Sequence, residues 1–279
     1  MPDTIFHIHL VSDSTGETLE AIANAALAQF KDRNVNRHYW PLMRTPVQME
    51  RVVQDMAETP GLVMYTLVNK NIRNALELKC REMNLPTLSV LDPVINLLGS
   101  YLGAKAARQP GLQHIMDADY FSRIDAVHYT MAHDDGQMAD DLSGADIVII
   151  GVSRTSKTPT SMYLANKGFC IANVPFVPNC PLPPGLKKLD KQFVVGLTTS
   201  PDRLILVREN RLRSLKQDSL SDYIDIDLVR LEVKLCRRLC AENEWPVIDV
   251  TRRSIEESAV AILNLHQKWQ QEQKAGKIQ

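Results

Sequence analysis

An apolar run leads directly into a hydroxyl-rich loop and then a lysine–threonine pair in GADIVIIGVSRTSKTPTSMYLANKG, residues 144–168. A strand, a loop and Lys-[Ser/Thr] opening a helix are together typical of a phosphate-binding loop. In such a loop, main-chain N–H groups surround the phosphates and the helix N-terminus adds partial positive charge. The predicted nucleotide-binding residues are consecutive: Gly151, Val152, Ser153, Arg154, Thr155, Ser156, Lys157 and Thr158.

Two side chains of this loop have predicted roles of their own. The Lys157 ammonium would act catalytically by reaching the terminal phosphates, and the Thr158 hydroxyl would be a metal ligand, binding Mg²⁺. The usual pattern GxxxxGK[ST] has glycine where this chain has Ser156, and glycine is favoured there because it adopts positive φ readily. Pro159 suits the first helical turn. The alternative is that the Ser, Thr and Gly residues only cap a helix after a strand.

Two carboxylates and a group of arginines are further candidates. Asp202 and Asp249 lie at predicted strand ends, where either could hold Mg²⁺ or its water; a helix cap and a satisfied buried polar group, respectively, explain them equally well. The arginines of one short stretch fit either a lid over phosphoryl groups or a solvated helix face. They are Arg203, Arg208, Arg211 and Arg213.

A second loop near the N-terminus repeats the strand–loop–helix order, in VSDSTGETLE over residues 11–20. Its hydroxyl groups, free N–H groups and Gly16 suit a phosphate or phosphoamino acid. Asp13 would repel an anion there unless it binds metal or takes up a proton. The alternative is a helix cap in which Ser14 and Glu17 form a capping box.

Both halves of the chain alternate short apolar runs with helical patterns. The apolar runs are 5–13, 61–69, 85–92, 146–151, 169–177, 193–199 and 246–251, and the helical segments are 17–30, 71–84, 158–168 and 254–269. This alternation predicts parallel strands joined by crossover helices, hence an α/β fold.

We predict two domains: an N-terminal α/β domain with a parallel sheet and a linker region over 1–142, and a P-loop kinase-like, nucleotide-binding α/β domain over 143–279. Residues 104–143 are polar and acidic, and they predict a linker with an irregular or helical connection. Residues 178–190 contain four prolines and predict a segment without regular structure.

The composition is that of an ordinary globular protein, with 44% hydrophobic and 23% charged residues among 279. A net charge of −1 gives no general attraction for nucleic acid. No apolar run approaches the roughly 18 residues of a membrane span, and no signal peptide is apparent. We therefore expect a cytoplasmic protein without a nucleic-acid or membrane partner. The five cysteines form no CxxC pair and are predicted to be reduced. Cys236 and Cys240 are predicted to be buried thiols.

Several stretches together resemble the bifunctional kinase/pyrophosphorylase regulators of pyruvate, phosphate dikinase and phosphoenolpyruvate synthase. They are HLVSDSTGETLE, RIDAVHYTMAHDDGQ, GADIVIIGVSRTSKTPTSMYLANKG, VPFVP and WPVIDVTRRSIEESA, and they cover both halves. The form GVSRTSKTPTS, with serine before lysine, is the variant found in this family, which accounts for Ser156.

The resemblance implies an ADP-dependent protein kinase that inactivates its target by phosphorylating a threonine close to the catalytic histidine. It also implies a phosphorylase, in which inorganic phosphate attacks the phosphothreonine and releases pyrophosphate. ADP would be the phosphoryl donor, bound with Mg²⁺ by residues 151–158, and Lys157, Asp13 and Asp249 are the candidate catalytic residues. The target would be the dikinase or the synthase, with the dikinase favoured, and a homodimer is compatible with the family. The N-terminal domain would dock the target.

Two other functions remain consistent with the same loop. A small-molecule P-loop kinase has the same strand–loop–helix order and an arginine-rich lid. A non-catalytic nucleotide-sensing module would use the loop only to reshape a binding surface.

Overall fold

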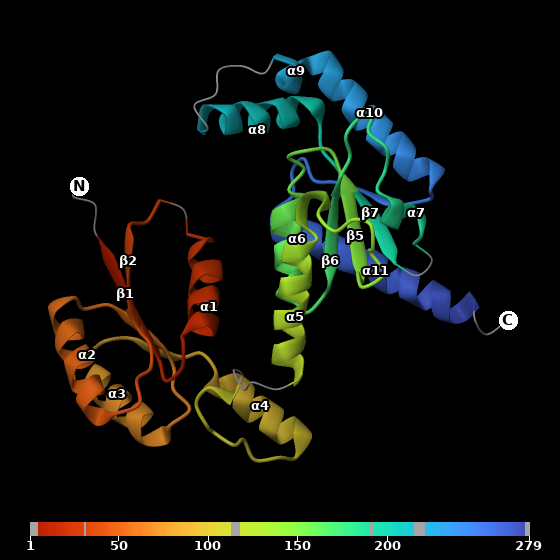
Figure 1. Cartoon of the computed structure of the whole chain (residues 1–279). Helices are drawn as coiled ribbons and strands as arrows, with labels where there is room; N and C mark the ends of the chain where they lie inside the picture. Colours follow the sequence, from red (N-terminus) through yellow and green to blue (C-terminus); the bar gives the residue numbers. More distant parts are fainter. Residues whose placement is uncertain (1–4, 31, 113–117, 190–191, 215–220, 277–279) are drawn as a thin grey trace. The chain divides into compact units, whose positions relative to one another are not determined.

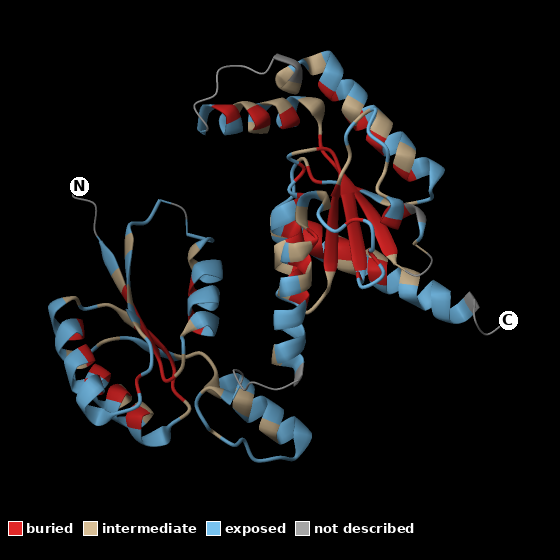
Figure 2. Cartoon of the chain, viewed as in Figure 1, coloured by how far each residue is buried: buried red, intermediate tan, exposed pale blue. Residues whose placement is uncertain are grey.

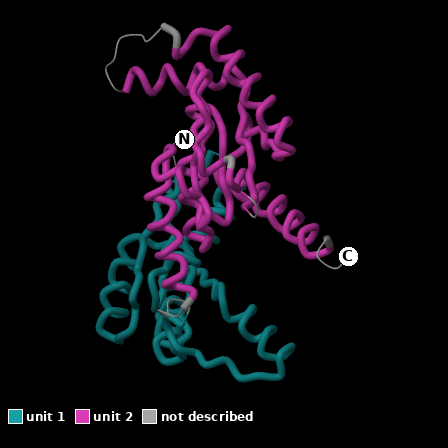
Figure 3. Tube along the Cα trace, turned by 45° about the vertical axis from the view of Figure 1, so that its right-hand side comes forward, with its two compact units in different colours: residues 1–115 teal, residues 116–279 magenta. Residues whose placement is uncertain are grey.

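The computed structural model divides the chain into two compact units, residues 1–115 and 116–279 (Figure 3). It describes residues 5–30, 32–112, 118–189, 192–214 and 221–276. Each unit contains a four-stranded parallel sheet with helices on its faces. The predicted α/β class with two parallel-sheet parts is confirmed.

The predicted domain boundary at 142/143 falls inside the second unit. The segment before it forms α5 (Ala118–Ala132) and a 3-10 turn, η2 (Asp134–Gly136). The Thr130 hydroxyl of α5 accepts a hydrogen bond from the Ile171 N–H at 3.0 Å, and the His133 carbonyl accepts one from the Asn173 N–H at 3.0 Å. Residues 118–136 of the predicted linker region therefore pack on the second sheet, which the polar composition of the region did not indicate.

In the first unit the strands are β1 (Phe6–Ser12), β2 (Val35–Trp40), β3 (Leu62–Thr66) and β4 (Thr87–Ser89), in the order β2-β1-β3-β4. Figure 1 labels β1 and β2 of this sheet. The helices are α1 (Glu17–Leu27), α2 (Pro46–Glu58), α3 (Lys70–Glu82) and α4 (Asp92–Leu102). The chain leaves β1 toward β2 on one side and returns to β3 on the other. The carboxyl ends of β1 and β3 therefore form a topological switch point, where α/β folds bind ligands.

Successive side chains of β1 point to opposite faces of the sheet, and each face has its own apolar layer. On one face Ile8 and Leu10 pack with Leu19 and Ala23 of α1, which are one helical turn apart. On the other face Val11 packs with buried residues of β3, α2 and α3. The buried residues colour the strands and the helix faces that pack against them in Figure 2.

The second unit repeats this plan with β5 (Ile147–Gly151), β6 (Ile171–Pro175), β7 (Phe193–Thr198) and β8 (Val247–Asp249), in the order β6-β5-β7-β8. Its other helices are α6 (Lys157–Ala165), α7 (Pro184–Lys187), α8 (Pro201–Ser214), α9 (Ser221–Ile224), α10 (Ile226–Glu242) and α11 (Ile255–Gly276). All five residues of β5 are buried. α6 and α11 pack on one face of the sheet, where Leu164 and Ile262 meet Ile147, while Cys240 of α10 packs on the other.

One prediction about local structure is wrong. Residues 178–190 were expected to lack regular structure, but α7 forms one helical turn within them. Its Pro184 is the first helical residue, where proline is tolerated because the N–H that it lacks has no helical partner. Leu186 of this turn is buried in the core. Among the described residues no helix is long and apolar enough to cross a membrane.

A cluster of three histidines, His7, His9 and His38, crosses β1 and β2. The Trp40 indole N–H donates to His9 Nδ1 at 3.2 Å, and His9 Nε2 lies 2.8 Å from the Thr59 carbonyl oxygen. Because a carbonyl can only accept, the proton of His9 is on Nε2, and the ring is neutral. His38 stacks on His9 with ring centroids 4.5 Å apart and shares a hydrogen bond with His7.

Burial lowers the pKa values of His9 and His38 below 6.5, and repulsion between the rings lowers them further. The unfolded chain therefore takes up protons more readily, so stability is fully present above pH 6.5 and is lost as the pH falls below it. We predict that urea unfolding of the first unit requires less urea at about pH 5.5 than at about pH 7.5.

The control variant is His38→Gln, which removes one titrating ring next to His9 but retains a polar side chain. Its loss of stability over the same pH interval should be smaller than that of the wild type. An equal loss in both proteins would show that the histidine cluster does not cause the pH dependence.

Candidate functional site

The predicted phosphate-binding loop lies between β5 and α6, at the switch point of the second sheet. A Cβ atom at Gly151 would lie 2.5 Å from the Leu197 carbonyl oxygen and 2.9 Å from Thr155 Oγ1. Any side chain at this position would therefore clash with the backbone of β7. The loop is closed internally by the Thr155 hydroxyl, which donates to the Val152 carbonyl at 3.0 Å.

Ser156 occupies the position of the second glycine in the usual pattern, and its backbone has the conformation that a glycine would have. Its φ is 60° and its ψ is 23°, in the left-handed region, and Arg154 also has a positive φ of 73°. Ser156 is the N-cap of α6 but makes no side-chain cap. The first N–H groups of α6 have no partner within the helix, and they are left free for an anion. The alternative prediction, a loop that only caps the helix, does not describe this geometry.

Lys157 begins α6 and is held against the loop. Its Nζ donates to the Val152 carbonyl at 3.0 Å, and only 6% of the residue is exposed. Burial lowers the pKa of Lys157 to about 8, although the nearby carboxylates of Asp135 and Asp134 oppose this effect. The lysine is thus a buried cation that lacks a directly bonded carboxylate, which favours binding of an incoming anion.

Thr158 is oriented by residues that the sequence analysis did not select. Its hydroxyl donates to the Asp134 carboxylate, at 3.0 Å from Oδ1 and 3.2 Å from Oδ2, and accepts from Asn173 Nδ2 at 3.1 Å. Asn173 Nδ2 also donates to Asp134. Asp134 comes from η2 and Asn173 from β6, so three separate segments meet at this hydroxyl. The only sequence signal for Asp134 was its place in HDDGQ, one of the stretches that carry the family resemblance.

A cavity of about 300 Å³ opens beside the loop. It is lined by Asp134, Asp135, Ser153, Arg154, Ser156, Lys157, Thr158, Pro159 and Val207. The Thr158 hydroxyl and the carboxylates of Asp134 and Asp135 are hard oxygen donors. Mg²⁺ typically takes a few such ligands together with phosphates and water. The residues present therefore fit a nucleotide-bound Mg²⁺. No group of three or more His, Cys, Asp or Glu among the described residues is arranged to hold a metal ion.

Arg208 supports the loop from α8. Only 1% of it is exposed, and its guanidinium donates to Glu232 at 2.6 Å, the Tyr223 carbonyl at 2.9 Å and the Ser153 carbonyl at 3.3 Å. It also lies over the Tyr223 ring, 4.4 Å from the centroid. Arg208 is thus neither a lid residue nor part of a solvated face, whereas the neighbouring arginines 203, 211 and 213 are exposed.

Asp202 and Asp249 do not line the cavity beside the loop. Asp202 is exposed in the first turn of α8, a position that favours acidic residues because of the helix dipole. Asp249 is exposed at the end of β8 and forms an ion pair with Arg237 at 3.3 Å. Burial raises its pKa, but hydrogen bonds from Thr251 and the charge of Arg237 outweigh this, and the net pKa is lowered. The predicted buried polar role of Asp249 is therefore wrong.

Asp13 belongs to the first unit, where it directly follows β1. Its Oδ2 accepts from the N–H groups of Val68 at 2.7 Å and Asn69 at 3.3 Å. Burial, the largest effect, raises the pKa of Asp13 although these hydrogen bonds lower it. The carboxylate thus joins the loops after β1 and β3. The capping box predicted for Ser14 and Glu17 is not formed, and α1 begins without a side-chain cap.

The chain matches the family model described as Kinase/pyrophosphorylase over residues 8–263. It therefore belongs to this family, and it is a kinase-like phosphotransferase.

Relatives named pyruvate, phosphate dikinase regulatory protein are similar to the chain over nearly its whole length. The relative from Rhizorhabdus wittichii is 52% identical over 259 residues, 93% of this chain and 94% of that protein. The one from Novosphingobium aromaticivorans is 53% identical over 260 residues, 93% of each chain. The one from Caulobacter vibrioides is 52% identical over 262 residues, 94% of this chain and 83% of that protein.

We predict that Arg208→Ala destabilises the second unit by roughly 3 kcal/mol, because it leaves Glu232 and two carbonyl groups without their donor. This loss of stability is at the low end of the range for removing one partner of a buried ion pair, because 24% of the Glu232 side chain is exposed. Arg203→Ala on the exposed face of the same helix should change stability by less than about 0.5 kcal/mol. Chemical denaturation of both variants measures the difference, and equal effects would contradict a supporting role for Arg208.

Proposed function

We propose that this chain is an ADP-dependent serine/threonine protein kinase that inactivates pyruvate, phosphate dikinase by phosphorylating a threonine near its catalytic histidine. The same chain restores the target by phosphorolysis of that phosphothreonine with inorganic phosphate. Membership of the Kinase/pyrophosphorylase family supports both directions. The observation that carries the proposal is the uncapped N-terminus of α6, with the buried Lys157 beside it.

The forward reaction transfers the β-phosphoryl group of ADP to the threonine hydroxyl. The new P–O bond joins the threonine oxygen to phosphorus, the bond between the α- and β-phosphates breaks, and the products are AMP and phosphothreonine, with the hydroxyl proton released. Such transfers depend chiefly on positioning and charge neutralisation. The free N–H groups of α6 would bind the β-phosphate, and Lys157 would neutralise charge that develops on it.

In the reverse regulation an oxygen of inorganic phosphate attacks the phosphothreonine. The bond between phosphorus and the threonine oxygen breaks, pyrophosphate leaves, and the threonine oxygen takes up a proton. Both reactions thus place two phosphoryl groups side by side in one site. A single loop of main-chain donors can hold either pair, because it recognises phosphate oxygens and not a base or sugar.

Asp134 and Thr158 have a positioning role in this proposal. Mg²⁺, when bound, would neutralise phosphate charge at this site, and the Thr158 hydroxyl would be one of its ligands. The Thr158 hydroxyl donates to the Asp134 carboxylate and accepts a hydrogen bond from Asn173, and these two contacts fix its orientation. Asp134 and Asp135 are also the carboxylates of the cavity lining, so either could accept the proton of the target hydroxyl.

The names of the relatives favour the dikinase as the target. The decisive experiment incubates the full chain with labelled ADP and either histidine-phosphorylated dikinase or histidine-phosphorylated phosphoenolpyruvate synthase. Mass spectrometry of the active-site threonine then identifies the product. Phosphorylation of the dikinase supports the proposal. Phosphorylation of the synthase alone would contradict the proposed target, and modification of neither would contradict the reaction.

Lys157→Ala should abolish kinase activity in this assay and also phosphorylase activity toward the threonine-phosphorylated target with inorganic phosphate, because one cation serves both reactions. Asp134→Asn should lower both rates by at least about tenfold, because a neutral amide oxygen holds the Thr158 hydroxyl more weakly than a carboxylate does. The matched control is Asp32→Asn, an exposed site in the first unit. A Lys157→Ala protein that kept either reaction near its wild-type rate would show that the two reactions use different sites.

The pKa of about 8 predicts how ADP binding depends on pH. The bound anion stabilises the ammonium form of Lys157, so the pKa of Lys157 rises in the complex. At a pH above the pKa of Lys157 in the free protein, ADP binding is therefore accompanied by uptake of a proton. Affinity for ADP should therefore fall as the pH rises above about 8, which titration calorimetry measures.

Lys157→Arg is the matched variant, because a guanidinium stays charged over this range. Its ADP affinity should not fall above pH 8, whatever its absolute value. A parallel decline in both proteins would assign the pH dependence to another group.

A further inference from the structure

Two exposed arginines of α8 flank the cavity beside residues 151–158. Val207 of α8 lines this cavity. Arg203 lies four residues before Val207 and Arg211 lies four residues after it, and side chains four residues apart share one face of a helix. Both arginines are exposed. We call Arg203, Val207 and Arg211 the α8 stripe, and it extends the wall of the cavity along the helix in both directions.

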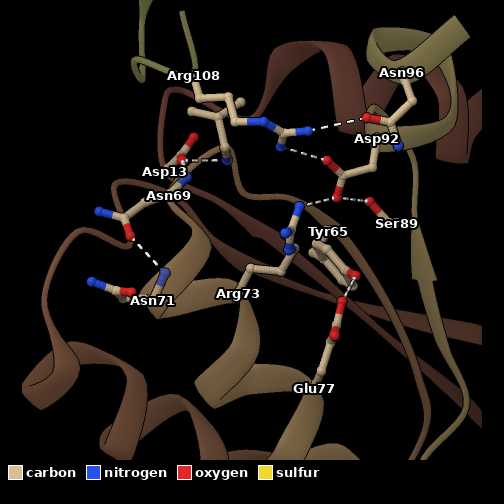
Figure 4. Close-up of polar contacts among 11 residues, drawn as sticks. Asp13, Tyr65, Asn69, Asn71, Arg73, Glu77, Ser89, Asp92, Asn96 and Arg108 are labelled. Carbon is tan, nitrogen blue, oxygen red and sulfur yellow. Dashed lines mark hydrogen bonds and ion pairs between the residues drawn. The ribbon is translucent and has the colours of Figure 1, made fainter. Parts of the chain in front are cut away.

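The arginines of the α8 stripe differ from other arginines of the chain in having no carboxylate partner. In the first unit, Arg73 and Arg108 share the Asp92 carboxylate, at 2.6 Å and 3.0 Å (Figure 4). Three exposed arginines of the second unit each pair with an acidic residue three or four positions away: Arg213 with Glu209, Arg230 with Asp227, and Arg238 with Glu242. Among the described residues, neither guanidinium of the stripe has a hydrogen bond or an ion pair. Their charge is therefore available to a partner.

The sequence of α8 keeps acidic groups away from the stripe. Its two acidic residues, Asp202 and Glu209, lie about 140° and 160° around the helix from Val207. Arg203 is also in the first turn of α8, where the helix dipole disfavours a positive charge. Neither a local ion pair nor helix stability accounts for an arginine at this position.

The length of the stripe indicates what kind of anion it fits. Arg203 and Arg211 are eight residues apart, which is about 12 Å along a helix. Two adjacent phosphate groups held at the loop do not cover this length, so one nucleotide cannot bind both guanidinium groups. In an extended peptide, side chains four residues apart point to the same side and are separated by about 13 Å. The stripe therefore matches a peptide segment with acidic side chains at that spacing.

The position of the stripe also suits a protein ligand. A substrate side chain that enters the cavity leaves the rest of its segment outside, against the surface that borders the opening. α8 is part of that border through Val207. A guanidinium group binds a carboxylate through two parallel hydrogen bonds, which would hold such a segment in a defined position.

We propose that the α8 stripe binds an acidic segment of the protein substrate, with Arg203 and Arg211 each holding a carboxylate. That the bound protein is the one to be phosphorylated rests on the function proposed above. Binding of acidic side chains by the stripe does not depend on that reaction.

The first test measures the binding of a fluorescently labelled deca-glutamate peptide to the full chain by fluorescence anisotropy. Saturating ADP is present, so that the phosphate-binding loop is occupied, and the salt concentration is physiological, so that charges more than about 8 Å apart are largely screened. The wild-type protein should bind the peptide saturably. Arg203→Glu and Arg211→Glu should each weaken binding at least about tenfold, because each replaces attraction by repulsion.

Arg213→Glu is the matched control, because it makes the same change of charge two residues from Arg211. At 3.6 residues per turn, positions 211 and 213 lie about 160° apart around the helix. Peptide binding by Arg213→Glu should therefore stay within about twofold of the wild type. Urea unfolding of each variant checks that it is folded, and Arg203→Glu tests the stripe independently if Arg211→Glu does not fold.

The second test uses the kinase assay with histidine-phosphorylated dikinase. Arg211→Glu should raise the KM for the dikinase at least about tenfold and leave the affinity for ADP within about twofold of the wild type. If the peptide results hold but the wild-type chain phosphorylates neither target enzyme, the proposed reaction is wrong and the binding site remains.

Three results would overturn the proposal. The first is that the wild-type protein does not bind the peptide saturably. The second is that Arg211→Glu and Arg213→Glu weaken peptide binding equally. The third is that Arg211→Glu lowers the affinity for ADP as much as the affinity for the peptide, which would assign the stripe to the nucleotide.

Discussion

The free N–H groups at the start of α6 are the feature on which the rest of the second unit depends. They exist because the chain leaves β5 through a turn that is too tight for a side chain at Gly151 and that ends in a left-handed residue without a cap. Such a turn is unfavourable for a serine by itself, and it persists where the surrounding structure enforces it. Buried β5, packed between β6 and β7, provides that enforcement.

Charged groups from other segments hold this turn from both sides. Arg208, from α8, binds the carbonyl of Ser153, and Asp134, from the turn before β5, binds the hydroxyl of Thr158. A buried charge is costly unless it is paired, and the buried Arg208 is paired with Glu232. Asp134 is partly exposed and also accepts a hydrogen bond from the Asn173 amide. Lys157 is the exception, with a carbonyl oxygen as its bonded partner. It is the group best suited to accept a phosphate.

The two units share one plan although their sequences show no repeat. Each sheet has its first strand in the interior, its second strand on one side and its third on the other. In each, the first strand ends in a hydroxyl-rich loop, and the next helix begins after an uncapped left-handed residue, Gly16 or Ser156. Equivalent loops in the two sheets therefore have similar donors, and the difference lies in the lysine, which the first unit lacks at this position.

The sequence by itself determined the α/β class, the strand–loop–helix around residues 151–158 and the family. These depend on local spacing: apolar runs of strand length, a glycine before the loop, and Lys-Thr at a helix start. Only the tertiary structure decided which carboxylates of the second unit line the cavity beside that loop. Asp134 reaches Thr158 because η2 packs on β6, whereas Asp249 at a strand end pairs with Arg237 on the surface. Contacts between segments far apart in the chain follow from packing, for which spacing along the sequence provides no signal.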